Sequence, residues 1–106
     1  MTEIGAIGAN SVVSTQDRNS VIFTAISDPH RRAIVERLAR NGPMTVGELS
    51  TPFAISAPAI SRHLKVLEAA GVVRRTVDRQ WRACQLELAG LRQARSWLET
   101  VLTAND

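Results

Sequence analysis

The sequence lacks the features that several classes of protein require. Its 106 residues include a single cysteine, Cys84, which excludes an internal disulfide framework and fits a reducing cytosol. No apolar run approaches the roughly 20 residues that cross a membrane as a helix. The N-terminus has no basic segment followed by an apolar one, so we expect no signal peptide. A chain of this length with 44% hydrophobic residues predicts one cytoplasmic domain, small enough to gain from oligomerisation.

Catalytic groups are missing as well. The sequence has no glycine-rich phosphate loop, no Cys–His or Ser–His–Asp arrangement on a plausible scaffold, and no paired carboxylates on one helix face. Ser61 and His63 are two residues apart on a predicted helix, so their side chains point in different directions. We therefore expect neither an enzyme nor a cofactor.

Positive charge is concentrated in one part of the chain. The net charge is +3, but residues 1–55 are neutral, residues 56–82 carry +4 and residues 83–106 carry −1. An excess of arginine confined to one segment is typical of a nucleic-acid-binding surface.

The middle of the chain predicts two short helices joined by a tight turn. Thr45 and Glu48 have the spacing of a capping box at the start of the first helix, and Pro52 cannot continue it. Ser56 is the predicted N-cap of the second helix, and Gly71 supplies the left-handed residue that commonly ends one. The pair has the pattern of a helix-turn-helix.

The second of these helices has two distinct faces. Ile60, Leu64 and Leu67 recur at helical spacing and predict a buried stripe. The residues predicted to face DNA are Ser56, Ala57, Pro58, Ala59, Ser61, Arg62 and Lys65. Small residues allow a close approach, and arginine can pair with guanine through two hydrogen bonds. Taken alone, this helix could equally be an ordinary amphipathic helix with a solvated charged face.

After Gly71 the periodicity becomes that of strands. Residues 72–77 and 81–88 predict two strands joined by a turn at 78–80, with Cys84, Leu86 and Leu88 on one buried face. The predicted DNA-contacting residues of this hairpin are Arg74, Arg75, Arg79, Gln80 and Arg82. A basic hairpin directly after such a helix predicts a winged helix, with Arg79 against the DNA backbone or in the minor groove.

The flanking segments complete a mainly α fold with one β-hairpin, in the order α-α-α-α-β-β-α. Residues 1–19 predict a flexible tail or arm, and residues 20–106 the folded domain. A helix with Asp28 as N-cap and Pro29 at its first position ends at Asn41-Gly42-Pro43. Arg31 and Arg32 near its start oppose the helix dipole, so we expect an acid or phosphate nearby to offset them.

The closing helix, residues 90–103, has more apolar surface than so small a domain needs. We expect it to pair with its symmetry mate, together with the first helix. The predicted dimer interface comprises Val21, Ile22, Ala25, Ile26, Leu91, Ala94, Leu98, Val101 and Leu102. Packing onto the core of the single chain is the alternative.

The run SDPHRRAIVERLARNGPMTVGELSTPFAISAPAISRHLKVLEAAGVVRRTVDRQWRACQLE resembles the ArsR/SmtB family of bacterial winged-helix repressors. The resemblance covers roughly residues 20–103. It implies a homodimer that sits on operator DNA and blocks transcription until an effector releases it. By position, it places Ser61 and Arg62 on the bases, Pro58 and Ala59 at the floor of the groove, and the wing arginines on phosphate.

The metal-binding motifs of that family are absent. Residues 47–51 stand where a C-x-C pair would lie, and residues 90–103 contain no histidine. Cys84, His30 and His63 form no recognisable ligand set, and a histidine placed like His63 is more often packed and hydrogen-bonded. We therefore expect no metal site and no metal response, and the sequence does not identify another effector.

Two other functions remain open from the sequence. A winged helix can dock a protein in place of DNA, but Ser61, Arg62 and Lys65 on the outward face argue against that alternative. A repressor of the MarR type would normally need a longer chain with extended helices at both ends.

Overall fold

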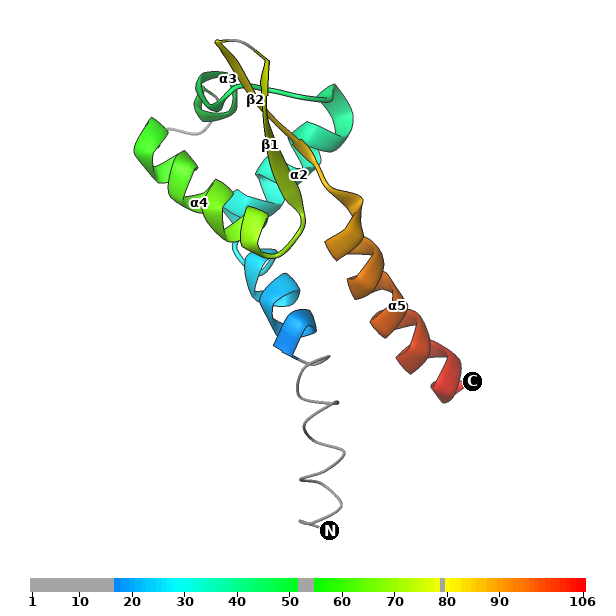
Figure 1. Ribbon diagram of the computed structural model, residues 1–106. Helices are drawn as coiled ribbons and strands as arrows, with labels where there is room; N and C mark the ends of the chain where they lie inside the picture. The colour runs from blue at the N-terminus through cyan, green and yellow to red at the C-terminus, as the bar shows by residue number, and fades with distance from the viewer. Residues whose placement is uncertain (1–16, 52–54, 79) are drawn as a thin grey trace.

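The computed structural model describes residues 17–51, 55–78 and 80–106. Its elements are a helical segment at residues 17–25, α2 (Pro29–Asn41), α3 (Val46–Ser50), α4 (Ala57–Ala69), β1 (Val73–Asp78), β2 (Trp81–Leu86) and α5 (Leu88–Asn105) (Figure 1). This is the predicted winged helix-turn-helix, with the elements in the predicted order.

The predicted helix starts are confirmed by their hydrogen bonds. The Asp28 carboxylate accepts from the Arg31 main-chain N–H at 3.0 Å, and the Ser56 hydroxyl accepts from the Ala59 N–H at 3.3 Å. Thr45 and Glu48 form both halves of the capping box that begins α3. At the other end of α4, Gly71 has a φ of +70°, which only glycine adopts at no steric cost.

The apolar stripe of α4 lies at the centre of the core. Ile60, Leu64 and Leu67 are fully buried, and Ile34 of α2 and Leu49 of α3 are buried in the same cluster. Each such side chain contributes about 1.5–3 kcal/mol by leaving water. One face of α4 is therefore fixed to the protein, and its opposite face is directed outward.

The hairpin pairs β1 with β2 in antiparallel register, from Val73 opposite Leu86 to Asp78 opposite Trp81. The segment before α3 adds an isolated antiparallel bridge to β2, because Met44 and Cys84 exchange main-chain hydrogen bonds of 2.9 and 2.7 Å. The predicted extension of the second strand to Leu88 is wrong. Glu87 N-caps α5, so Leu88 begins that helix and is 43% exposed.

The predicted alternation of buried and exposed residues along β2 is also wrong in part. Ala83 and Cys84 are consecutive, and both are buried. Since successive side chains of a strand point to opposite faces, both faces of the hairpin are covered at this position.

The segment 17–25 and α5 pack together and extend from the same end of the molecule, away from the hairpin tip (Figure 1). Phe23 and Trp97 meet edge to face, with ring centroids 5.6 Å apart. The structure places Asp17–Asn19 in this helix, although the sequence assigned them to the tail, and it buries Asn19. The rest of the predicted tail, residues 1–16, lies outside the described residues.

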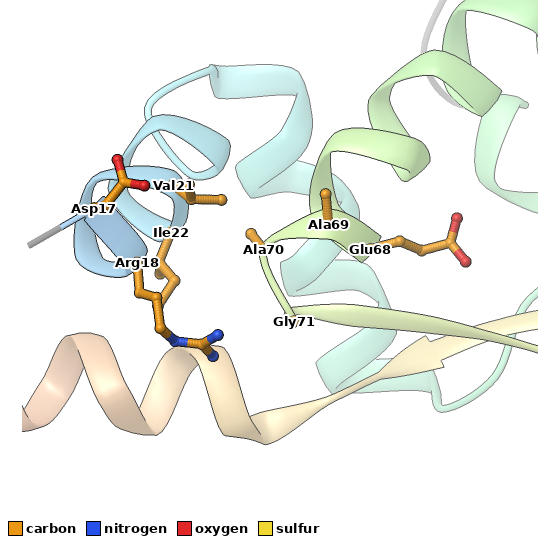
Figure 2. A pocket seen from close by; sticks show the side chains of 8 residues that line it. All are labelled: Asp17, Arg18, Val21, Ile22, Glu68, Ala69, Ala70 and Gly71. Carbon is orange, nitrogen blue, oxygen red and sulfur yellow. The ribbon is translucent and has the colours of Figure 1, made fainter. Parts of the chain in front are cut away.

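The N-terminal end of α5 lies directly against the turn between α4 and β1. The Gly90 N–H donates to the Gly71 carbonyl at 2.9 Å. A hollow of about 220 Å³ lies between the segment 17–25 and the end of α4, with Val21 and Ala69 among its walls (Figure 2). No helix in the described part of the chain is long and apolar enough to cross a membrane.

Candidate nucleic-acid interface

The outward face of α4 is accessible along its N-terminal half. Of the residues that the sequence assigned to DNA, Ser56, Ala57, Pro58, Arg62 and Lys65 are exposed, and Ala59 and Ser61 are half-buried. All seven therefore lie outside the core, and the small side chains at the start of the helix leave its first turn open to a close approach.

Arg62 and Lys65 supply the charge of this face. Neither has a hydrogen bond or ion pair to another residue within the described ranges. Two exposed cations one turn apart that no described residue neutralises are available to phosphates or base edges.

Arg75 fastens the hairpin to α4. Its Nε lies 3.1 Å from Glu68 Oε1, and its Nη2 donates to the main-chain carbonyl of Ser61 at 3.3 Å. A half-exposed ion pair is worth only about 0–1 kcal/mol, but the two contacts set the direction of the hairpin relative to the helix. Arg75 is thus committed in part to positioning, a role the sequence did not indicate.

The remaining hairpin residues differ in how they are engaged. With the Gln85 amide oriented so that its oxygen faces Arg74, the guanidinium donates two hydrogen bonds to it, at 2.6 and 2.5 Å. Gln80 and Arg82 are exposed. Arg79, the predicted tip contact, lies outside the described residues.

Arg31 and Arg32 are offset by a partner that the sequence did not predict. Arg31 donates to the carbonyls of Ala25, at 2.7 Å, and Thr24, at 3.2 Å. Arg32 donates to the carbonyls of Ile26 and Ser27, both at 2.9 Å. The two guanidinium groups therefore cap the C-terminal end of the helix at 17–25, whose dipole favours cations. The expected acid is present for Arg31, because its charge also attracts that of Asp28.

Arg31 also reaches α4, where its Nη1 lies 3.4 Å from His63 Nδ1. Since arginine can only donate, this ring nitrogen accepts. Burial lowers the pKa of His63, in agreement with a neutral imidazole. The predicted packed and hydrogen-bonded histidine is confirmed.

His63 belongs to a cluster of ionisable groups. Its ring stacks on that of His30, with centroids 5.9 Å apart and planes at 22°. His30 Nδ1 lies 3.9 Å from Asp28 Oδ2. A hydrogen bond from the main chain of Arg31 lowers the pKa of Asp28, so the carboxylate is charged at neutral pH. No motif signalled this cluster, because only the packing of α2 on α4 brings His30 to His63.

The predicted dimer residues fall into two groups. Ile22, Ala25 and Ala94 are buried in the core of the single chain, so a partner cannot reach them in this conformation. Val21, Leu98, Val101 and Leu102 are 41–65% exposed, and Ile26 and Leu91 are half-buried. Trp97 of α5 is also exposed, at 44%. The exposed apolar residues thus lie on the segment 17–25 and on α5.

Known proteins are similar to this chain in both sequence and fold. Residues 26–76 match the family model of a helix-turn-helix domain. The chain is 46% identical over 81 residues to the HTH-type transcriptional regulator Rv2034 of Mycobacterium tuberculosis, covering 76% of this chain and 75% of that one. It is 35% identical over 85 residues to the transcriptional repressor SdpR of Bacillus subtilis, covering 80% and 93%.

Among solved structures, the crystal structure of the ArsR family transcriptional regulator RHA00566 superposes with a TM-score of 0.77 at 34% identity, covering 84% of this chain and 91% of that one. The chain therefore belongs to the ArsR family of winged helix-turn-helix regulators, and it is a DNA-binding transcriptional regulator and not an enzyme.

Proposed function

We propose that two copies of this chain form a twofold dimer that binds an inverted-repeat operator and represses transcription in the cytoplasm. The observation that carries the proposal is the outward face of α4, where Ser61, Arg62 and Lys65 lie outside the core while the opposite face is fixed inside it. This is the arrangement that presents a helix to the major groove.

The apolar surface on α5 supports the dimer. Leu98, Val101 and Leu102 are 46%, 48% and 65% exposed. Exposed apolar side chains three and four residues apart share one helix face, and such a face favours burial against a partner. A twofold axis along this surface would direct two α4 helices to half-sites about one helical turn apart, roughly 34–36 Å.

The basic residues divide by role under this proposal. Arg62 and Ser61 read base edges, whereas Lys65, Arg74, Arg79 and Arg82 contact phosphates and hold the register. Arg75 orients the wing through Glu68. The alternative of a protein-docking module would favour apolar groups on the outward face of α4, where Arg62 and Lys65 stand.

The relationship to SdpR, a transcriptional repressor, favours repression over activation. Gly47–Thr51 and the closing helix lack the ligands of the family's usual metal sites, so we expect the effector to act by another route. Its chemical identity is not implied by these residues.

The test is a footprint on the DNA upstream of the gene for this chain, repeated at several salt concentrations. We expect a protected inverted repeat and an affinity that falls steeply with salt, because bound phosphates release counterions. Affinity independent of both sequence and salt would contradict the proposal.

Two variants separate base reading from charge. Arg62→Ala is expected to cost about 1–3 kcal/mol on the operator and to relax the preference at one base position. Arg82→Ala should weaken operator and unrelated DNA alike. Arg95→Ala, which removes the same charge from α5, is the control and should leave operator affinity nearly unchanged.

The dimer is tested by sedimentation of a second pair of variants. Val101→Glu places a charge in the proposed interface and should shift the chain to a monomer at micromolar concentration. Val77→Glu changes a valine on the hairpin that is more exposed than Val101, at 65% against 48%, and should leave the dimer intact. A wild-type chain that sediments as a monomer would remove the dimer from the proposal.

A further inference from the structure

The cluster at the start of α2 contains three potential metal ligands from two helices. Asp28 and His30 lie at the start of α2, and His63 lies on α4. One ligand atom from each residue can be chosen so that all three lie within 4.8 Å of one another. We propose that Asp28, His30 and His63 form a binding site for a divalent transition-metal ion, with zinc as the ion that best matches the ligands.

The ligand chemistry favours such an ion. Two imidazoles and one carboxylate are a set that zinc accepts, with a fourth position left for water. Metal–ligand bonds of about 2.0–2.2 Å place neighbouring ligand atoms roughly 3.3 Å apart in a tetrahedron. The present separations, at most 4.8 Å, therefore need to shrink by up to about 1.5 Å. The His30 side chain is 51% exposed, so rotation of its ring can shorten its own separations from the other two ligand atoms.

Asp28 can cap α2 and bind the metal ion at the same time, since a carboxylate has about four lone-pair sites.

Arg31 is the competitor for this site. Its Nη1 lies 3.4 Å from His63 Nδ1, near the limit for a hydrogen bond, and its positive charge opposes a nearby cation. Its other contacts, to Ala25 O at 2.7 Å and Thr24 O at 3.2 Å, are shorter and hold the guanidinium on the preceding helix. Metal binding would thus replace only the weakest of the three contacts.

The proposed site is at neither of the two positions where the family's usual metal ligands would stand. Those positions are residues 47–51 and the closing helix, and both lack the ligands in this chain. It also departs from the expectation, drawn from the sequence, that the chain carries no metal site. A metal ion there would join the start of α2 to the turn of α4 that contains Ser61 and Arg62. Metal binding requires no DNA, so it is measured apart from the proposed function.

The experiment uses the full chain without an affinity tag, freed of metal and titrated with zinc or cobalt alone. We expect one ion per chain, an absorption spectrum of bound cobalt without a thiolate charge-transfer band, and a rise in Tm on adding zinc. His30→Gln and His63→Gln should each abolish these changes, and Asp28→Asn should weaken them. Asparagine remains a good N-cap, and His30 is exposed, so at least two of these variants should fold.

Glu36→Gln, which removes an exposed carboxylate from the same helix, is the control and should bind zinc like the wild type. Binding of zinc that survives either histidine substitution would overturn the proposal. The absence of binding to the wild-type chain at micromolar zinc would also overturn it.

Discussion

Gly90→Ala tests the contact between α5 and the turn that follows α4. A Cβ at Gly90 would lie 2.5 Å from the Ala70 carbonyl oxygen and 2.8 Å from that of Gly71. Both atoms are main chain, so no rotamer change relieves the overlap. The Gly90 N–H also donates to the Gly71 carbonyl at 2.9 Å, which ties the two segments together where the extra atom would separate them.

Two opposing effects set the change in the free energy of unfolding that Gly90→Ala causes. Overpacking of a close contact typically costs about 1–3 kcal/mol, whereas alanine is preferred to glycine inside a helix by roughly 0.5–1 kcal/mol. Since main-chain atoms cannot yield as a flexible side chain does, the first effect prevails. We expect Gly90→Ala to lower the free energy of unfolding by about 1–2 kcal/mol.

Gly47→Ala is the matched control. A Cβ there meets nothing closer than Thr45 Oγ1, at 3.9 Å, and Gly47 also lies in a helix. The substitution should therefore raise the free energy of unfolding by about 0.5–1 kcal/mol. Urea denaturation followed by circular dichroism, at one fixed chain concentration, measures both variants. A Gly90→Ala chain as stable as the wild type would refute the reasoning.

Three further predictions concern the core, a helix cap and the buried thiol. Leu64→Ala should lower the free energy of unfolding by about 2–5 kcal/mol, because Leu64 is fully buried; a loss below 1 kcal/mol in urea denaturation would mean that the site collapses without cost. Thr45→Ala removes the hydroxyl that accepts from the Glu48 N–H at 3.1 Å and should cost about 0.5–2 kcal/mol in the same assay, while Thr103→Ala near the end of α5 should change little. Burial raises the pKa of Cys84 above its ordinary 9.0, so above that pH the unfolded chain loses a proton that the folded chain keeps, and stability should fall as pH rises. Cys84→Ala should flatten this alkaline part of the stability profile, and an unchanged slope would contradict the assigned cause.

Much of the fold was predictable from local signals. Asp28, Thr45 and Ser56 mark helix starts because each side chain satisfies main-chain N–H groups a few residues away. Ile60, Leu64 and Leu67 mark the buried face of α4 because their spacing matches the helical period. The basic character of residues 56–82 is likewise a property of the sequence alone, and the DNA-binding face proposed above rests on it.

Contacts between residues far apart in the sequence decided the remaining features of the structure. The sequence could not show that Arg31 and Arg32 cap the helix before them, that Arg75 spans from the hairpin to Glu68, or that Ile22, Ala25 and Ala94 lie inside one chain. The sequence also could not show that the rings of His30 and His63 stack on each other. Each of these arrangements depends on the angle at which two elements meet. Local periodicity fixes which face of an element is apolar, but the full set of side chains packed between elements fixes that angle.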